Sequence, residues 1–507
     1  MADSDMVVLT DSVGDIDTAD QLTMAAAFQK VFIANGANLK VADFINTKIA
    51  TNDAGATACT SGTILTGGTS GAKMIVDYVT GVTDDAASTI YGYRTTSATF
   101  TTEAVTGNGG QSFTTSGAET AAPHWYSWTV FGNDTTTYGT MPNKAYLVAV
   151  YRGRLVLAGN PEYANQWYMS RVAKPFDFLY GADDPMSAVA GNNADAGQCP
   201  DIIRSLISFH DDYLIFGCAS TLWILRGDPV SGGSLDNLSD TTGMYGSNSW
   251  CFDDDRNLYF WGTGGIYKIE ANFSGITNLT ETLLPDLIDD EAADPSTHRI
   301  TMGYDKKRHG IVICITVLAT GVNSNYFYSF KTRGFFPETY PEEASAYSLL
   351  YYDANDPDYA DLLIGSRDGY IRKFLNTAKD DDIGATDEAI SSYVTYPITP
   401  LSEEDVEGKL KEMVFDLAGG ASSGAFSDTD GVTYSLFKGD DAETVLEDII
   451  DGATAFKTAA LTGTGRKNKI RPRMRGAYMG LKLANSTASE SWSINKVLFD
   501  TRKAGKL

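Results

Sequence analysis

The sequence has 507 residues, of which 43% are hydrophobic, 11% aromatic and 21% charged, a balance typical of packed globular proteins and not of disordered chains. Its 65 acidic and 39 basic residues give a net charge of -26, which argues against a protein that grips nucleic acid or an anionic membrane over most of its surface. The 49 glycines, together with frequent Thr, Tyr, Val and Ile, favour a β-rich fold.

The N-terminal segment is acidic. Its first twenty residues contain six aspartates and no basic residue, so we expect no secretory signal, which would begin with a cationic region. The longest apolar run, around residues 310–322, is too short to span a bilayer. We therefore expect a protein made in a cytoplasm, with no membrane-spanning segment.

Six segments share one pattern, in which an apolar strand, a polar turn, a second strand and an aromatic-rich third strand follow one another. They are residues 24–44, 147–170, 205–227, 249–271, 300–332 and 347–374. From the second segment onward they begin about fifty residues apart, a period typical of propeller blades. The sequence predicts an all-β fold with a β-propeller of about six blades, each made of four short antiparallel strands.

A segment rich in Thr, Gly and Ser separates the first two repeats. Its centre, residues 62–107, consists of short alternating strands between glycine-containing turns, which predicts an inserted small β module. The run Gly68–Lys73 has the sequence GTSGAK but lacks the spacing of a phosphate-binding loop. We therefore expect no nucleotide site there.

Strand-like runs return after an acidic linker at residues 379–382. Five of them lie between Tyr393 and Asp500, with one helix-like stretch around residues 441–451, which predicts a C-terminal β-sandwich-like platform. The predicted domains are an N-terminal segment with the first propeller strands (1–50), the inserted module (51–140), the propeller blades (141–378) and the platform (379–507).

Residue patterns that would indicate chemistry are weak. The four histidines stand in no metal-binding or nucleophile-activating pattern, and the five cysteines form no C-x-x-C pair. Asp253, Asp255 and Asn257 match the start of a calcium loop, but Leu258 replaces its glycine, so a hairpin turn is expected. The turn 366–369 resembles the Asp-box turn of sialidase blades, but Ile371 and Arg372 stand where that motif ends in Thr-Trp. We predict no catalytic, cofactor-binding or metal-binding residues.

A basic run interrupts the acidic background at residues 466–475. Four of its cations alternate, so that on a strand they would point to one face: Lys469, Arg471, Arg473 and Arg475. Three interpretations fit these cations. They would protect an exposed edge strand by their charge, pair with acidic patches of a neighbouring subunit, or contact phosphate. We select these four residues as candidate interface residues.

The order of these segments resembles the nozzle, or tail-hub (tail tubular), protein of short-tailed bacteriophages. The resemblance extends over residues 147–500. It is found first in the stretches 154–178, 183–191, 202–228 and 243–269. A return strand at 311–316, a Tyr/Phe-rich strand at 326–336, the sequence GSRDGYIRKF at 365–374 and the basic strand near 466–483 follow in the same order. The inserted module is not expected in the propeller of that family.

The resemblance implies a structural protein of the virion tail, without enzymatic activity or cofactor. Six copies would form a homohexameric tube below the head-to-tail adaptor, contact tail fibres or spikes, and enclose the path of the ejected genome. An acidic lining would repel duplex DNA and let it pass without specific binding. The alternatives are a receptor- or glycan-binding propeller of the tail tip, a propeller glycosidase, and a neck or tail-tube protein of a longer tail.

Overall fold

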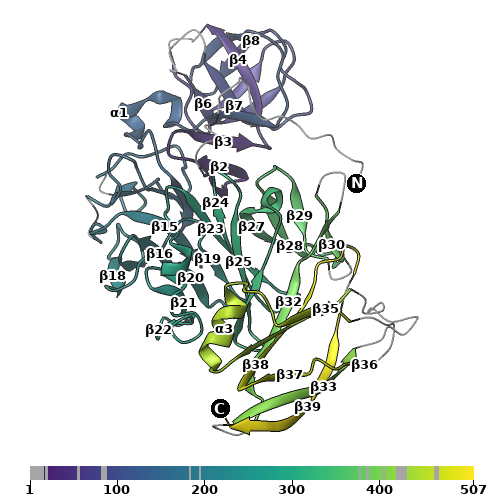
Figure 1. The fold of residues 1–507 in the computed structure, drawn as a ribbon. Helices are drawn as coiled ribbons and strands as arrows, with labels where there is room; N and C mark the ends of the chain where they lie inside the picture. Colours follow the sequence, from purple (N-terminus) through teal and green to yellow (C-terminus); the bar gives the residue numbers. More distant parts are fainter. Residues whose placement is uncertain are drawn as a thin grey trace. The chain divides into compact units, whose positions relative to one another are not determined.

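The computed structural model describes residues 16, 21–53, 57–81, 88–181, 184–192, 194, 196–375, 378–383, 387–402, 406–417, 431–461, 467–490 and 492–506. The aspartates of the first twenty residues lie outside these ranges. The protein is all-β, with 50% strand and 5% helix, which confirms the expected all-β class (Figure 1). The chain divides into two compact units, Met1–Pro295 and Ser296–Leu507, which are described separately.

The first unit contains four antiparallel sheets of four strands each. The first sheet has the order β1 (Thr23–Ala27), β2 (Lys30–Ala34), β3 (Leu39–Asp43) and β10 (His124–Ser127), and the second β11 (Leu147–Tyr151), β12 (Arg154–Ala158), β13 (Trp167–Met169) and β14 (Val189–Ala190). The third has β15 (Ile203–Phe209), β16 (Tyr213–Cys218), β17 (Leu222–Arg226) and β18 (Ser234–Ser239), and the fourth β19 (Trp250–Phe252), β20 (Leu258–Gly262), β21 (Gly265–Ile269) and β22 (Ile276–Asn278).

Burial and turn chemistry explain why these segments form stacked sheets. All five residues of β12 and of β20 are buried, as expected for strands covered on both faces by neighbouring layers. Between β11 and β12 the turn residues Arg152 and Gly153 have φ angles of 47° and 69°. Two successive positive φ angles are those of a type I′ turn, whose twist matches the flanking strands.

A closed barrel interrupts the first sheet between β3 and β10. Its strands are β4 (Thr47–Asp53), β5 (Ile64–Gly67), β6 (Lys73–Thr80), β7 (Thr89–Arg94), β8 (Ala104–Gly107) and β9 (Ser112–Thr115), in the order β4-β7-β6-β5-β8-β9. Buried Ile49, Leu65 and Val105 belong to its apolar core. Two short helices of this unit follow, α1 (Thr135–Tyr138) after β10 and α2 (Leu287–Glu291) after β22.

The second unit begins with two more small antiparallel sheets. One has β23 (His298–Asp305), β24 (Gly310–Val317), β25 (Asn323–Ser329) and β26 (Gly334–Glu338); the other has only β27 (Ala346–Tyr352), β28 (Asp361–Ser366) and β29 (Ile371–Lys373). They pack on each other, and Val312 and Cys314 of β24 belong to the same buried apolar cluster as Leu362 and Ile364 of β28. The hairpin of β30 (Asp380–Asp381) and β31 (Glu388–Ala389) follows.

Two further sheets complete the second unit. The first has the order β32 (Ser392–Pro400), β38 (Tyr478–Asn485), β34 (Thr433–Gly439) and β35 (Lys457–Ala460), and helix α3 (Ala442–Ile450) packs on it. In the second, the central strand β33 (Val406–Leu417) pairs on one edge with β36 (Lys467–Ile470) and β37 (Met474–Gly476), and on the other with β39 (Ile494–Lys506) (Figure 1). Leu410, Phe415, Leu436 and Leu481 are buried between the two sheets.

Candidate functional site: a basic sheet face and a charged cavity

The four candidate interface residues lie along one edge of β33. Lys469 is on β36, Arg475 is on β37, and Arg471 and Arg473 are in the link between these strands. All four side chains are exposed and alternate with buried residues such as Pro472. The predicted alternation is therefore present, although Arg473, with a φ of 53°, divides the run into two short strands.

Carboxylates of the central strand β33 pair with three of these cations. Glu412 forms ion pairs with Lys469 and with Arg471, whose Nε is 3.3 Å from a carboxylate oxygen, and Glu407 pairs with Arg475. The hydrogen bond from Lys469, more than that from Arg471, lowers the pKa of Glu412. The cations nevertheless remain at least half exposed, so they are accessible to a second anionic partner.

The sheet register adds cations that sequence reasoning missed. Lys409 of β33 is directly opposite Arg475 on one side and Arg502 of β39 on the other. Side chains of one cross-strand row point to the same face, so these three cations stand side by side. Lys409 alternates with buried Gly408 and Leu410, a local signal of exposure, but nothing in the sequence pairs it with Arg502.

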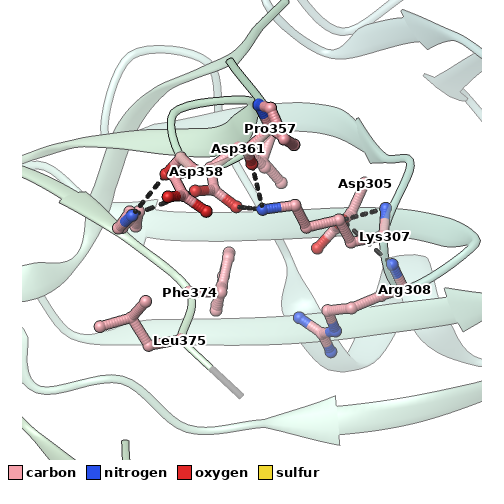
Figure 2. Close-up of a pocket in the computed structure, with 10 residues that line it drawn as sticks. Asp305, Lys307, Arg308, Pro357, Asp358, Asp361, Phe374 and Leu375 are labelled. Carbon is pink, nitrogen blue, oxygen red and sulfur yellow. Dashed lines mark hydrogen bonds and ion pairs between the residues drawn. The ribbon is translucent and has the colours of Figure 1, made fainter. Parts of the chain in front are cut away.

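A second feature is a cavity of about 310 Å³ where turns of the first two sheets of the second unit meet (Figure 2). Its lining combines three acids, three cations and an apolar wall: Asp305, Lys307, Arg308, Pro357, Asp358, Asp361, Leu362, Lys373, Phe374 and Leu375. The nearly buried Asp361 accepts hydrogen bonds from Lys307 and, at 3.2 Å, from Lys373. The bond from Lys307 is the largest cause of its lowered pKa.

Arg308 anchors the other side of this cavity. Its guanidinium carbon is 3.9 Å from the ring centroid of Phe327 and 5.0 Å from that of Phe374, which are distances of cation–π contacts. It also forms an ion pair with Glu338. With Asp361 and Arg308 both paired, the cavity presents fixed charges beside the ring of Phe374. The side chains of Lys307 and Lys373, which both pair with Asp361, are 44% and 37% exposed.

Other residues singled out in the sequence have structural surroundings. The Asp253 carboxylate accepts hydrogen bonds from the backbone and side chain of Asn257, both at 2.8 Å, and from Tyr259, which makes this segment a hairpin turn. Asp368, in the Asp-box-like turn, is held by Arg372 at 2.6 and 2.8 Å. All five cysteines are free and buried.

The described ranges contain neither a metal-binding cluster nor a membrane-spanning helix. Within them, no group of three or more His, Cys, Asp or Glu side chains is arranged to hold a metal ion. In the same part of the chain, every helix is too short or too polar to cross a membrane.

Neither a protein-family model nor a curated protein matches the sequence. Among solved structures, the chain is similar to PorZ, an essential bacterial surface component of the type-IX secretion system of Porphyromonas gingivalis, at 13% identity and a TM-score of 0.32, over 98% of this chain and 60% of PorZ. It is also similar to the extracellular domain of a putative one-component system of B. thetaiotaomicron, at 11% identity and a TM-score of 0.26, over 96% of this chain and 75% of that one.

A third similar structure is an auxiliary nutrient-binding protein from Bacteroides ovatus, at 8% identity and a TM-score of 0.26, over 71% of this chain and 87% of that one. The chain thus spans only 60% of the length of PorZ. At these identities, none of the three assigns a function to this chain.

Proposed function

We propose that this protein is a structural subunit of the tail nozzle or hub of a short-tailed bacteriophage. In this role it belongs to the virion tail, surrounds the path of the ejected genome below the head-to-tail adaptor, and gives attachment to fibres or spikes. The observation that supports it best is the position of the basic C-terminal segment. The chain has a net charge of -26, yet the cations from Lys469 to Arg475 lie on an exposed sheet face. There they can pair with acidic residues of another subunit.

We further propose that the six small sheets are the blades of one propeller. Such a ring requires an apolar face at each end of the series. On β27 and β29, Leu350 and Ile371 are 64% and 73% exposed, and the opposite face of that sheet is packed. On β1, Met24 is 59% exposed, while its neighbour Ala25 packs in the core with the second sheet. Burial of these end faces against each other would stabilise the ring.

The experiment that tests the tail assignment is immunogold electron microscopy of intact and genome-emptied particles from an infected culture, with antibody raised against this chain. We expect label confined to the tail at the single unique vertex. Preimmune serum is the control. Particles without label, in a culture whose lysate contains the protein, would contradict a virion role.

A second candidate function is receptor or glycan binding, which the cavity favours. Sugar-binding sites combine an aromatic face with charged and polar side chains, and Phe374, Lys307, Lys373 and Asp358 provide these. Binding of the purified protein on a glycan array, lost in Lys373→Ala and kept in Lys331→Ala, an exposed cation of another turn, would support this function. Absence of binding on the array would argue against it.

A further inference from the structure

A row of like charges crosses the sheet centred on β33. Arg475, Lys409 and Arg502 stand directly opposite one another on three adjacent strands, which lie about 4.8 Å apart. Like charges in such positions destabilise a sheet. Within the described ranges, an ion pair is formed by Arg475 with Glu407, and none by Lys409 or Arg502. A row that costs stability in the isolated chain would be relieved by an anionic partner.

The row belongs to a larger surface, which we call the cationic face. Its cations are Lys409, Lys469, Arg471, Arg473, Arg475, Lys496 and Arg502, all exposed. Acidic residues of β33 and β39 share this face, namely Glu407, Glu412, Asp416 and Asp500. The cations outnumber the acids, whereas the chain as a whole has 65 acidic against 39 basic residues.

An acidic counterpart exists at another place in the sequence. The segment 281–294, which includes α2, contains six carboxylates and no basic residue: Glu281, Asp286, Asp289, Asp290, Glu291 and Asp294. Five of these are exposed and Glu291 is partly buried. We call this stretch the acidic segment.

We propose that the cationic face docks onto the acidic segment of a second copy of this chain. Two cationic faces repel each other, so a symmetric contact of this face with itself is disfavoured. The contact therefore joins two different patches, either reciprocally in a two-fold dimer or head to tail in a closed ring or an open filament. The argument uses only charge and register, so it stands independently of the tail assignment.

Nucleic acid is the less favoured partner. The four carboxylates on the cationic face would lie against phosphates, and the net charge of -26 repels a polyanion as a whole. The carboxylates of an acidic protein surface can instead form ion pairs with these cations in place of the carboxylates on the same face. Opposite charges across an interface also fix its register.

The test measures the mass of the full-length protein by light scattering and native mass spectrometry at about 0.1 M and about 1 M salt, since charges are screened beyond about 3 Å at the higher value. We expect oligomers at low salt that dissociate at high salt. Lys409→Glu/Arg502→Glu should weaken association about tenfold or more. Lys174→Glu/Lys331→Glu, which reverses two exposed cations elsewhere, should leave it unchanged.

A charge exchange tests directly whether the cationic face contacts the acidic segment. Asp286→Lys/Asp289→Lys should also weaken association, whereas a mixture of this variant with Lys409→Glu/Arg502→Glu should restore it, because each cationic surface then meets an acidic one. Thermal denaturation checks that each variant is folded. Restoration in the mixture, absent in either variant alone, is the expected result.

Three results would overturn the inference. They are a wild-type protein that is monomeric at about 0.1 M salt, variants that associate as the wild type does, and a mixture that stays dissociated. A fluorescent DNA duplex, measured by anisotropy under the same conditions, tests the other partner; binding that Lys409→Glu/Arg502→Glu abolishes, with self-association unchanged, would assign the face to nucleic acid. Tail label in the immunogold experiment combined with unaffected variants would reject only this interface.

Discussion

Arg154 is the largest polar side chain in the core of the first unit, and it is completely buried. Its guanidinium donates hydrogen bonds to the carbonyl oxygens of Ser170 at 3.1 Å, Pro185 at 3.1 Å and Ser187, and lies 3.5 Å from the Asp228 carboxylate. It therefore ties β12 to the link between β13 and β14. Because these partners are distant from Arg154 in the sequence, no local pattern predicts this role.

Arg154→Leu is expected to destabilise the protein by about 3 to 5 kcal/mol, because it leaves buried carbonyl oxygens without donors and one carboxylate without its cation. Urea unfolding followed by fluorescence measures the free energy. The control Lys174→Leu changes an exposed side chain and should stay within about 0.5 kcal/mol of wild type. Equal stability of the two variants would contradict the anchoring role of Arg154.

Asp381 gives a pH-dependent prediction at the same scale. Burial raises its pKa to about 6, and the charges of Glu388, directly opposite on β31, and Asp380 add to the shift. Because this pKa exceeds the value of 3.8 of a free aspartate, ionisation destabilises the folded state. The penalty is complete above about pH 6, and it diminishes as the pH falls toward 4.

Asp381→Asn should therefore stabilise the protein by about 1 kcal/mol near pH 7, after allowance for solvent screening, and by less near pH 5. The matched control is Asp380→Asn, which should bring no gain because the Asp380 carboxylate accepts hydrogen bonds from the backbone and side chain of Ser489. Denaturant unfolding at both pH values measures the unfolding free energy of each variant. A gain that is the same at both would contradict the ionisation argument.

At the scale of elements, helix α3 shows how a shift of one residue decides burial. Ile449 is buried against Phe437 and Val445, whereas its neighbour Ile450 is 73% exposed. The helix begins at the cap residue Asp441, whose side chain accepts a hydrogen bond of 2.7 Å from the backbone N–H of Thr444. The helical stretch expected around residues 441–451 is present, and its packing face follows from the helical period.

Ile449→Ala should cost about 3 kcal/mol of unfolding free energy, because it removes buried methylene groups and leaves a cavity. Ile450→Ala makes the same chemical change on the exposed side and should cost less than about 0.5 kcal/mol. Thermal unfolding of the two variants compares them directly. Similar losses for both would mean that α3 does not pack by the face described.

At the scale of the whole molecule, the proposed ring of six blades makes a chemical prediction. Because all five native cysteines are buried, cysteines introduced as Met24→Cys and Leu350→Cys would be the reactive thiols. A flexible bis-maleimide should join them within one chain at high dilution, as mass spectrometry of the denatured protein would detect. The single-cysteine variants are the controls. Cross-links only between chains would contradict a ring closed within one chain.

The all-β class and the strand-turn-strand segments could be predicted because their signals are local. Alternating burial has a period of two residues, and a turn such as Arg152-Gly153 needs only its own dihedral angles. The exposure of Lys469, Arg471, Arg473 and Arg475 has the same local origin. Whether the six sheets close one ring stays a prediction.

Strand pairing depended on the tertiary structure. Strand β10 completes the first sheet across the whole barrel, and Lys409 meets Arg502 only through the register of β33 with β39. Neither pairing has a local signal, because hydrogen bonds between strand edges join residues that are distant in sequence. The sequence by itself therefore determined which residues form strands and which of their side chains face outward. The long-range pairing of those strands, which burial stabilises, was decided only in the tertiary structure. This pairing brings cations that are distant in sequence together on one cationic face.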